Sequence, residues 1–212
     1  MRFIIFIAVC FSIFSASAQE ATITYDVLLN TEDDYVQNKT DIMGGSKMIL
    51  TYASEQLKEE EFWGENMAAA THIYDEKSQQ GLLFLNGPTG KLGSIFNLDQ
   101  VSIPEYEIEY TDEVKDIAGY SCKKAIIHQG NTETIYWYTE EIEPPKARSK
   151  YIYQEIQGVP LHIIKSTEEM VFEYTVSTIS LEVSQEEGLF QIVMPEGYLA
   201  QPYKELKEIL IN

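Results

Sequence analysis

Hydrophobic and polar residues alternate in several short stretches of this chain, each bounded by turn-forming residues. In EYEIEY, the residues Tyr106, Ile108 and Tyr110 alternate with three glutamates. Because successive side chains of a strand point to opposite faces of a sheet, this pattern predicts a strand with one apolar and one acidic face. MVFEYTV repeats the pattern, with Phe172 and Tyr174 on the apolar face. TETIYWYT also alternates, with aromatic residues on both faces.

Turn signals recur at short spacing between these stretches, among them Gly44-Gly45, Gly130-Asn131 and Pro144-Pro145. Short runs of β-branched and aromatic residues between such turns are typical of an antiparallel β domain. Roughly ten strands of the usual length fit in the chain. Strands do not alternate with long helices, as a parallel sheet would require.

Two stretches have helical character. SEQLKEEEFW suits either a helix capped by Ser54 or part of a long charged hairpin, and propensity alone does not decide between them. After Pro202, the residues Tyr203, Leu206 and Leu210 fall on one side of a helix, which predicts a short C-terminal helix. The predicted fold class is therefore mainly β, a single antiparallel sheet with short helices.

Residues 1–18 have the features of a secretory signal peptide. A positive charge precedes the apolar segment Phe3–Phe14, and the small residues Ala16–Ala18 supply a cleavage site. The apolar segment is shorter than the about twenty residues that span a bilayer, so we do not expect an integral membrane protein. We expect cleavage before Gln19, export to the periplasm or the extracellular space, and a single β-rich domain over residues 19–212.

Acidic residues dominate the charge of the chain, whose formal net charge is −19. Such a surface repels nucleic acid and anionic lipid headgroups, so neither is expected as a partner. Clusters of acidic residues occur at 31–34, 58–61 and 139–143. We interpret them as solvated charge at sheet edges, which discourages pairing between sheets.

Patterns that would indicate catalysis or metal binding are scarce. His72, His128 and His162 are isolated from one another and from cysteine, so no metal site is expected. NGPTGKLGS lacks the spacing of a phosphate-binding loop, and the sequence has no nucleophile elbow. A carboxylate pair for glycoside hydrolysis stays open, because such pairs are defined by distance in the fold. The main hypothesis is a protein without catalytic residues, cofactor or enzymatic activity.

Cys122 is the one cysteine left after cleavage, because Cys10 lies within the signal peptide. It therefore cannot form an internal disulfide, which leaves a buried thiol, a reactive thiol or a bridge between chains. A reactive thiolate needs a nearby histidine or helix N-terminus, and His128 lies roughly 20 Å away along the predicted strand. We expect an inert, buried side chain.

Three segments, GYSCKKA, WYT and GVPLHI, carry a resemblance to known proteins. The residues concerned are Gly119, Tyr120, Cys122, Lys124, Trp137, Gly158 and Pro160. Together with the later FQIVMPEGY, these segments resemble exported Bacteroidetes proteins of unknown function, namely the GLPGLI family and a sister family. The resemblance is best over residues 105–198.

The sister family is similar to outer-membrane lipoprotein carriers. The resemblance implies an incompletely closed β-barrel, or strongly curved sheet, around an apolar hollow. It favours a strand for SEQLKEEEF and supplies no catalytic residues. It also implies that the signature cysteine and tryptophan hold the sheet together.

Two functions follow from this expectation. The first is a non-enzymatic binding protein that holds a lipid or another apolar ligand in its curved sheet. The residues expected to line the hollow are Tyr106, Ile108, Tyr110, Trp137, Phe172 and Tyr174. The alternative is a structural or interaction component of the cell envelope, with another envelope protein as its partner and no small-molecule ligand.

Overall fold

The computed structural model describes most of the chain between Glu20 and Ile211. The described residues are 20–30, 44–64, 69–87, 90–102, 105–149, 152–167, 170–184 and 187–211. The predicted signal peptide and the acidic cluster at 31–34 lie outside them. Within these ranges, no helix has the length and apolar character needed to cross a membrane.

The described residues form one twelve-stranded sheet. In chain order its strands are β1 (Glu20–Asn30), β2 (Lys47–Ala53), β3 (Gln56–Phe62), β4 (Ala69–Asp75), β5 (Gln80–Gly87), β6 (Gly90–Asn97), β7 (Glu107–Ile117), β8 (Tyr120–Gln129), β9 (Thr132–Thr139), β10 (Val159–Ser166), β11 (Val171–Ser180) and β12 (Leu199–Ala200). A 3-10 turn, η2 (Leu98–Gln100), follows β6, and the helix α2 (Tyr203–Ile211) follows β12.

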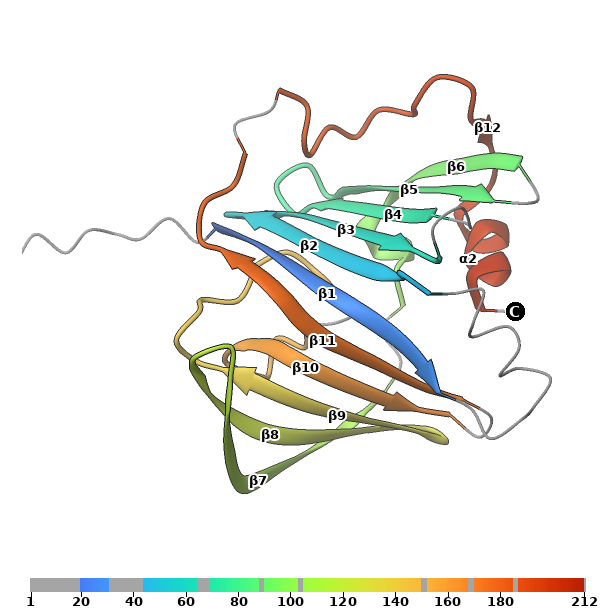
Figure 1. Ribbon diagram of the computed structural model, residues 1–212. Coiled ribbons are helices and arrows are strands. Elements are labelled where there is room, and N and C mark those ends of the chain that lie inside the picture. Colours follow the sequence, from blue (N-terminus) through green and yellow to red (C-terminus); the bar gives the residue numbers. More distant parts are fainter. Residues whose placement is uncertain are drawn as a thin grey trace, which may run out of the picture.

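The order across the sheet is β12-β6-β5-β4-β3-β2-β1-β11-β10-β9-β8-β7. Neighbouring strands are antiparallel except for the short β12, which pairs in parallel with β6. The sheet is strongly curved, but its two edge strands do not pair, so it is not closed into a barrel (Figure 1). The prediction of a mainly β chain with a C-terminal helix is confirmed.

Local sequence accounts for the two elements that were in question. SEQLKEEEF forms the β2–β3 hairpin, in which Ser54 adopts a positive φ of 57° in the turn instead of capping a helix. In α2, the apolar stripe faces the sheet: Leu206 is fully buried, and the ring of Tyr203 stacks on Phe96 with centroids 4.0 Å apart. The strand prediction for SEQLKEEEF is therefore confirmed.

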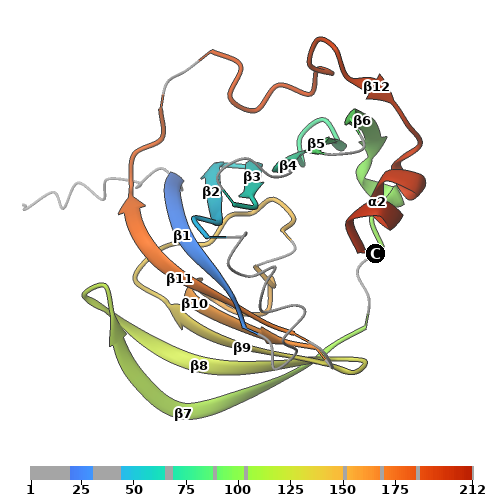
Figure 2. The same ribbon diagram turned by 45° about the vertical axis from the view of Figure 1, so that its right-hand side comes forward.

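The connection between β9 and β10 lies inside the curve of the sheet, where it forms part of the core (Figure 2). Its buried apolar residues are Ile142, Ala147, Ile152 and Ile156. Buried tyrosine hydroxyls bind the backbone at and near this connection: Tyr25 donates to the carbonyl of Pro160 at 2.7 Å, and Tyr52 to that of Glu143 at 2.8 Å. Here we call the side of the sheet that faces this connection the inner face.

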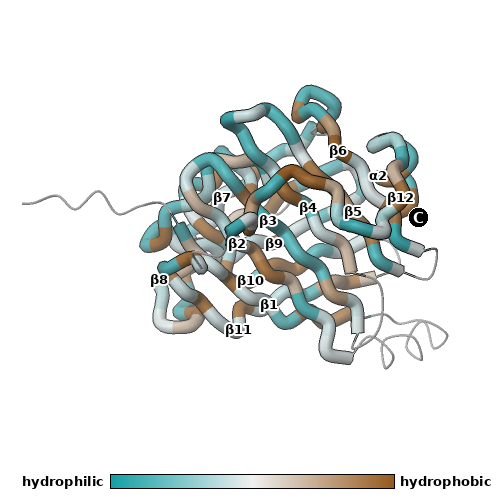
Figure 3. The backbone as a smooth tube through the Cα atoms, turned by 90° about the horizontal axis from the view of Figure 1, so that it is seen from above, coloured by the Kyte–Doolittle hydropathy of each residue, from teal (hydrophilic) through white to brown (hydrophobic). Residues whose placement is uncertain are grey.

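A second segment covers part of the opposite, outer face. We call it the strap; it comprises residues 181–184 and 187–198 and runs from β11 to β12 over the β4–β6 region (Figure 1). The ring of Tyr198 packs edge-on against Phe84 at 5.2 Å. Leu82 is buried although it lies outside the main core cluster. Figure 3 shows hydrophilic and hydrophobic residues interspersed along much of the sheet, as expected where many strands have one exposed face.

Candidate functional site

Five of the six residues predicted to line an apolar hollow lie on the inner face. Cross-strand pairing places Tyr110 and Tyr174 in one row there. Tyr106 and Ile108 follow on the same face by alternation from Tyr110, and Phe172 does so from Tyr174. The structure thus brings together five residues from the two predicted alternating strands.

The β9–β10 connection takes up the space next to these residues. The ring of Tyr106 packs edge-on against Tyr153 with centroids 4.6 Å apart, and its hydroxyl donates to the Glu155 carboxylate. The Tyr110 hydroxyl donates to the carbonyl of Glu155 at 2.8 Å, although this tyrosine is 54% exposed. The inner face is therefore packed against the chain itself, which the sequence pattern alone did not indicate.

Trp137, the sixth residue, lies on the outer face, opposite its neighbour Tyr136. The ammonium groups of Lys115 and Lys124 lie 4.5 and 5.8 Å from its ring centroid. Lys115 is also 3.2 Å from Nδ1 of His162. These contacts place Trp137 in a polar cluster on the outer face and apart from the other five residues.

The signature glycines and proline occupy positions where the backbone imposes constraints. Gly119 follows Ala118 in the β7–β8 turn, and both have positive φ, 84° and 54°, as a two-residue primed turn requires. A Cβ atom on Gly158 would lie 2.3 Å from the carbonyl oxygen of Thr139, so only glycine fits there. Pro160 lies at a register shift between β10 and β9.

Three further signature residues lie on β8. Cys122 is fully buried. Burial, reinforced by the charge of Asp116, raises the pKa of its thiol to about 11, so the thiol is protonated at neutral pH. Lys124 forms an ion pair with Glu113 at 2.6 Å, and Tyr120 is partly buried against the core.

The interpretation of the 58–61 cluster as solvated edge charge is wrong. Glu59 is 0% exposed and Glu61 is 5% exposed, because β3 lies inside the sheet and both side chains share the inner face with Leu57. The hydroxyl of Ser149 on the β9–β10 connection donates to Glu59, and His72 of β4 pairs directly opposite it. The alternation of Leu57 with these glutamates was the available signal, but it does not distinguish an edge strand from a central one.

An open cleft of about 600 Å³ lies between the ends of the first strands and the strap. From the sheet side it is lined by Glu20, Ala53, Gln56, Asp75, Ser78 and Gln80. From the strap it is lined by Val183, Ser184, Gly188, Leu189, Phe190, Gln191 and Ile192. None of the residues predicted from sequence lines this cleft, because its walls come from turns and irregular backbone that no alternating pattern marks.

Two adjacent hairpin turns form the sheet wall of the cleft. The backbone N–H of Glu76 donates to the carbonyl of Glu55 at 3.1 Å, which holds the β4–β5 turn against the β2–β3 turn. Asp75 accepts hydrogen bonds from the backbone of Lys77 at 2.9 Å and of Ser78 at 3.3 Å. The side-chain amide of Gln56 donates to its other carboxylate oxygen at 3.3 Å.

These hydrogen bonds keep Asp75 ionised. Burial acts to raise the pKa of its carboxyl, but the hydrogen bonds from Ser78, Lys77 and Gln56 outweigh burial, so the pKa lies below its usual value. Charge-assisted hydrogen bonds favour the ionised form of a carboxyl in this way. The cleft therefore contains a permanent negative charge near neutral pH.

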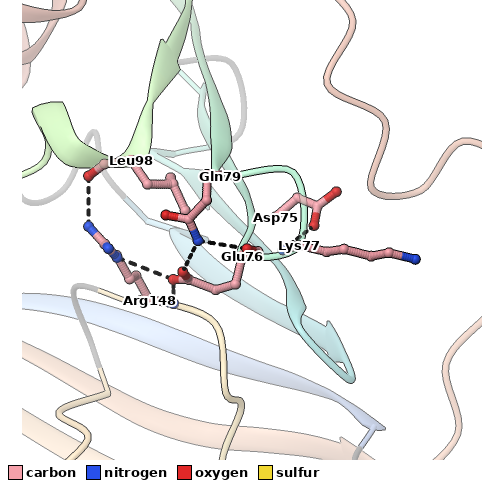
Figure 4. A network of polar contacts seen from close by, with 6 residues as sticks. All are labelled: Asp75, Glu76, Lys77, Gln79, Leu98 and Arg148. Carbon is pink, nitrogen blue, oxygen red and sulfur yellow. Dashed lines mark hydrogen bonds and ion pairs between the residues drawn. The ribbon is translucent and has the colours of Figure 1, made fainter.

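The β4–β5 turn is anchored from the inner side by Arg148 (Figure 4). The guanidinium of Arg148 lies 3.2 Å from a carboxylate oxygen of Glu76 and donates to the carbonyl of Leu98 at 2.7 Å. Gln79, which has a positive φ of 55°, donates to the carbonyl of Glu76 at 2.6 Å. The side chain of Asp75 points away from this network, so the turn presents Asp75 in a fixed position.

The strap supplies a wall of mixed polarity. Val183 is buried against the sheet, whereas Ser184 and Gln191 are exposed. The backbone N–H of Gln191 donates to the carbonyl of Gly188 at 3.0 Å, which closes a turn around Phe190. Amides, hydroxyls and carboxylates thus meet an aromatic ring in one cleft, an arrangement that suits a ligand with many hydroxyl groups and an apolar face.

The chain's described residues contain no group of three side chains suited to hold a metal ion. Comparison with known proteins gives two findings. The family described as "N-glycanase peptide, N-terminal domain" matches residues 76–187. Solved structures of PNGF-II in the P21 and C2 space groups share the fold, with TM-scores of 0.52 and 0.53 and 16% identity. Both cover 92% of this chain, which spans only about a third of theirs (34% and 33%). A search among curated proteins gives no match.

These findings overturn the resemblance drawn from the sequence. The family match and both solved structures concern N-glycanases, so the assignment to the GLPGLI family and to lipoprotein carriers is wrong. Lipid binding and a ligand-free envelope role, which rested on that assignment, are wrong as well. Because residues 76–187 make up more than half of its length, the chain belongs to the N-glycanase peptide, N-terminal domain family.

Proposed function

We propose that this chain is an accessory domain of an N-glycanase-type protein, and that its cleft binds part of an N-linked glycan. Two observations on kinship support this. The matching family is that of an N-terminal domain, and the chain spans about a third of the PNGF-II structures that share its fold. Both are consistent with a unit that serves a larger glycan-processing protein.

The cleft between the strand ends and the strap carries the proposal. Its volume of about 600 Å³ is in the range of small-molecule sites, about 300–1,000 Å³. Sugar hydroxyls both donate and accept hydrogen bonds, and the side chains of Gln80, Gln191 and Asp75 offer both kinds of partner. Phe190 offers a flat apolar surface for the C–H face of a sugar ring.

The chemistry of the cleft supports binding more than catalysis. Hydrolysis of a glycan linkage needs a general acid whose pKa lies near the working pH. The pKa of Asp75 is instead lowered, and both of its carboxylate oxygens already accept hydrogen bonds. The buried Glu59 and Glu61 lie on the inner face, away from the cleft. We therefore assign no catalytic residue to this domain.

Calorimetric titration with a matched pair of ligands tests this function. We expect the purified protein to bind a glycopeptide with one N-linked glycan, and not the same peptide without the glycan. Gln80→Ala and Gln191→Ala should each weaken binding about fivefold, the worth of one hydrogen bond of about 1 kcal/mol. Gln129→Ala removes the same group at the β8–β9 turn and should have no effect.

Three outcomes would contradict the proposal. One is equal binding of the peptide with and without its glycan, and another is unchanged binding by both cleft variants. The third is release of the glycan by this chain alone, followed by mass spectrometry of the glycopeptide. That result would make the chain an enzyme in its own right.

A further inference from the structure

We infer that the cleft selects uncharged sugars and excludes sugars that carry a carboxylate, sulfate or phosphate group. This inference rests on the proposed glycan-binding function and specifies its substrate class. It follows from the distribution of charge around the cleft and from the hydrogen bonds that fix that charge.

Negative charge surrounds the cleft on both walls. Glu20 and Asp75 line it from the sheet side. Glu55, Glu182 and Glu187 are each adjacent in sequence to a lining residue, and all three are exposed. The whole chain has a net charge of −19, so the field of the rest of the molecule has the same sign as that of the cleft.

Positive charge near the cleft is sparse in the described residues. Lys77 is in the β4–β5 turn, and its side chain extends away from the network in Figure 4. Arg148 lies on the inner side of that turn, where its guanidinium is paired with Glu76 and the carbonyl of Leu98. The lysines beside Trp137 lie on the other half of the sheet, and Lys124 is paired with Glu113 there.

The hydrogen bonds of Asp75 make its charge a permanent part of the site. The backbone N–H groups of Lys77 and Ser78 and the amide of Gln56 all donate to it. Its remaining lone pairs can accept hydrogen bonds from sugar hydroxyls, which carry a proton to donate. An ionised sugar acid has no proton to donate at that position and adds a like charge, so it loses the hydrogen bond and is repelled.

The size of the effect follows from Coulomb's law. Two like charges about 4 Å apart at a protein surface repel strongly enough to weaken binding by about tenfold or more, even with considerable solvent screening. Because the Debye length falls from about 30 Å at 0.01 M salt to about 3 Å at 1 M salt, the discrimination should shrink as salt is added.

A pair of glycopeptides that differ only in terminal sialic acid tests this inference. We expect the neutral glycopeptide to bind about tenfold more tightly at low salt and the difference to narrow at high salt. Glu20→Gln and Asp75→Asn should each reduce the discrimination; asparagine retains the turn-forming capacity of aspartate. Glu133→Gln, on β9 near the β8–β9 turn, is the control and should leave the ratio unchanged.

The outcomes separate this inference from the function on which it rests. Equal binding of both glycopeptides, or tighter binding of the sialylated one, would overturn charge selection and leave glycan binding intact. Binding of neither would overturn both. Discrimination that persists at high salt and in both charge variants would also contradict the inference, because its cause would then be shape.

Discussion

The two halves of the sheet differ in what covers them. In the half formed by β2–β6, the inner face packs against the core and the strap lies over part of the outer face. In the half formed by β7–β11, the inner face is packed in the same way but the outer face is largely exposed. Leu82 on the outer face of β5 is 1% exposed, whereas Val114 in β7 is 62% exposed. One curved sheet thus contains a region with two covered faces and a region with one.

The sequence reflects this difference. β5 contains the uninterrupted apolar run LLFL, whereas β7 begins by alternating glutamate with tyrosine and isoleucine. Strands buried on both faces are expected to be continuously hydrophobic, and strands with one wet face are expected to alternate. The candidate cleft occurs only in the doubly covered half, because the strap supplies its second wall. Covering a sheet face has here created a site at its margin.

High pH should test whether the two halves share one core, and we expect the largest effect from it. Burial raises the pKa of Tyr25, Tyr52, Tyr74 and Tyr136, which come from both halves. Their contribution to stability is complete below the unfolded pKa of about 10. It is lost as the pH rises from there towards their raised folded pKa values, by about 1.4 kcal/mol per pH unit for each phenol that ionises only on unfolding.

Absorbance of tyrosinate during an alkaline titration, with circular dichroism of the same samples, measures this. We expect the buried phenols to ionise together with the loss of structure, in one transition. Two separate transitions would show that the halves unfold independently. Ionisation of all four near pH 10 in the folded protein would contradict their burial.

Truncation of matched outer-face residues should reveal the contribution of the strap to stability. Leu82→Ala removes a buried side chain and should lower the free energy of unfolding by about 2–4 kcal/mol. Ile126→Ala, on the outer face of β8, should cost about 1 kcal/mol, because its side chain is only partly buried. Denaturant unfolding followed by tryptophan fluorescence gives both values; equal costs would contradict the difference between the halves.

Much of the fold could be predicted from alternation alone. EYEIEY, TETIYWYT and MVFEYTV lie within or overlap β7, β9 and β11, and the stripe after Pro202 forms α2. The packing of the β9–β10 connection against the inner face could not be foreseen. Its buried residues, such as Ile142 and Ile156, are scattered through irregular backbone and have no period.

The candidate cleft could not be predicted for a related reason. Asp75 and Gln191 are far apart in sequence and become neighbours of one cleft only because the strap crosses the sheet. Glu59 was misread because burial depends on where a strand lies in the sheet order, which its own sequence does not contain. The family resemblance failed because short motifs such as GYSCKKA occupy a turn and a strand that many β folds share.

Removal of single tyrosine hydroxyls should separate the packed inner face from its exposed margin. Tyr25→Phe leaves the buried carbonyl of Pro160 without its hydrogen bond and should cost about 1–3 kcal/mol. Tyr110→Phe loses a bond to the carbonyl of Glu155 that water can replace, and should cost about 0.5 kcal/mol or less. Unfolding curves in denaturant measure both, and a larger cost for Tyr110→Phe would place the true core at the margin.

Two glycine substitutions should have similar small costs in stability but different effects on the cleft. A Cβ atom on Gly93 would lie 2.4 Å from the sulfur of Met194 in the strap, whose flexible side chain can move aside, so Gly93→Ala should cost about 1 kcal/mol. Gly119→Ala strains a positive φ in the β7–β8 turn and should cost about the same. Only Gly93→Ala displaces the strap, so it alone should weaken binding of a neutral glycopeptide, by about twofold to fivefold on the scale of a partly lost hydrogen bond. Equal affinities of the two variants in calorimetric titration would mean that the strap does not hold the cleft in shape, and the doubly covered half would then be a matter of stability alone.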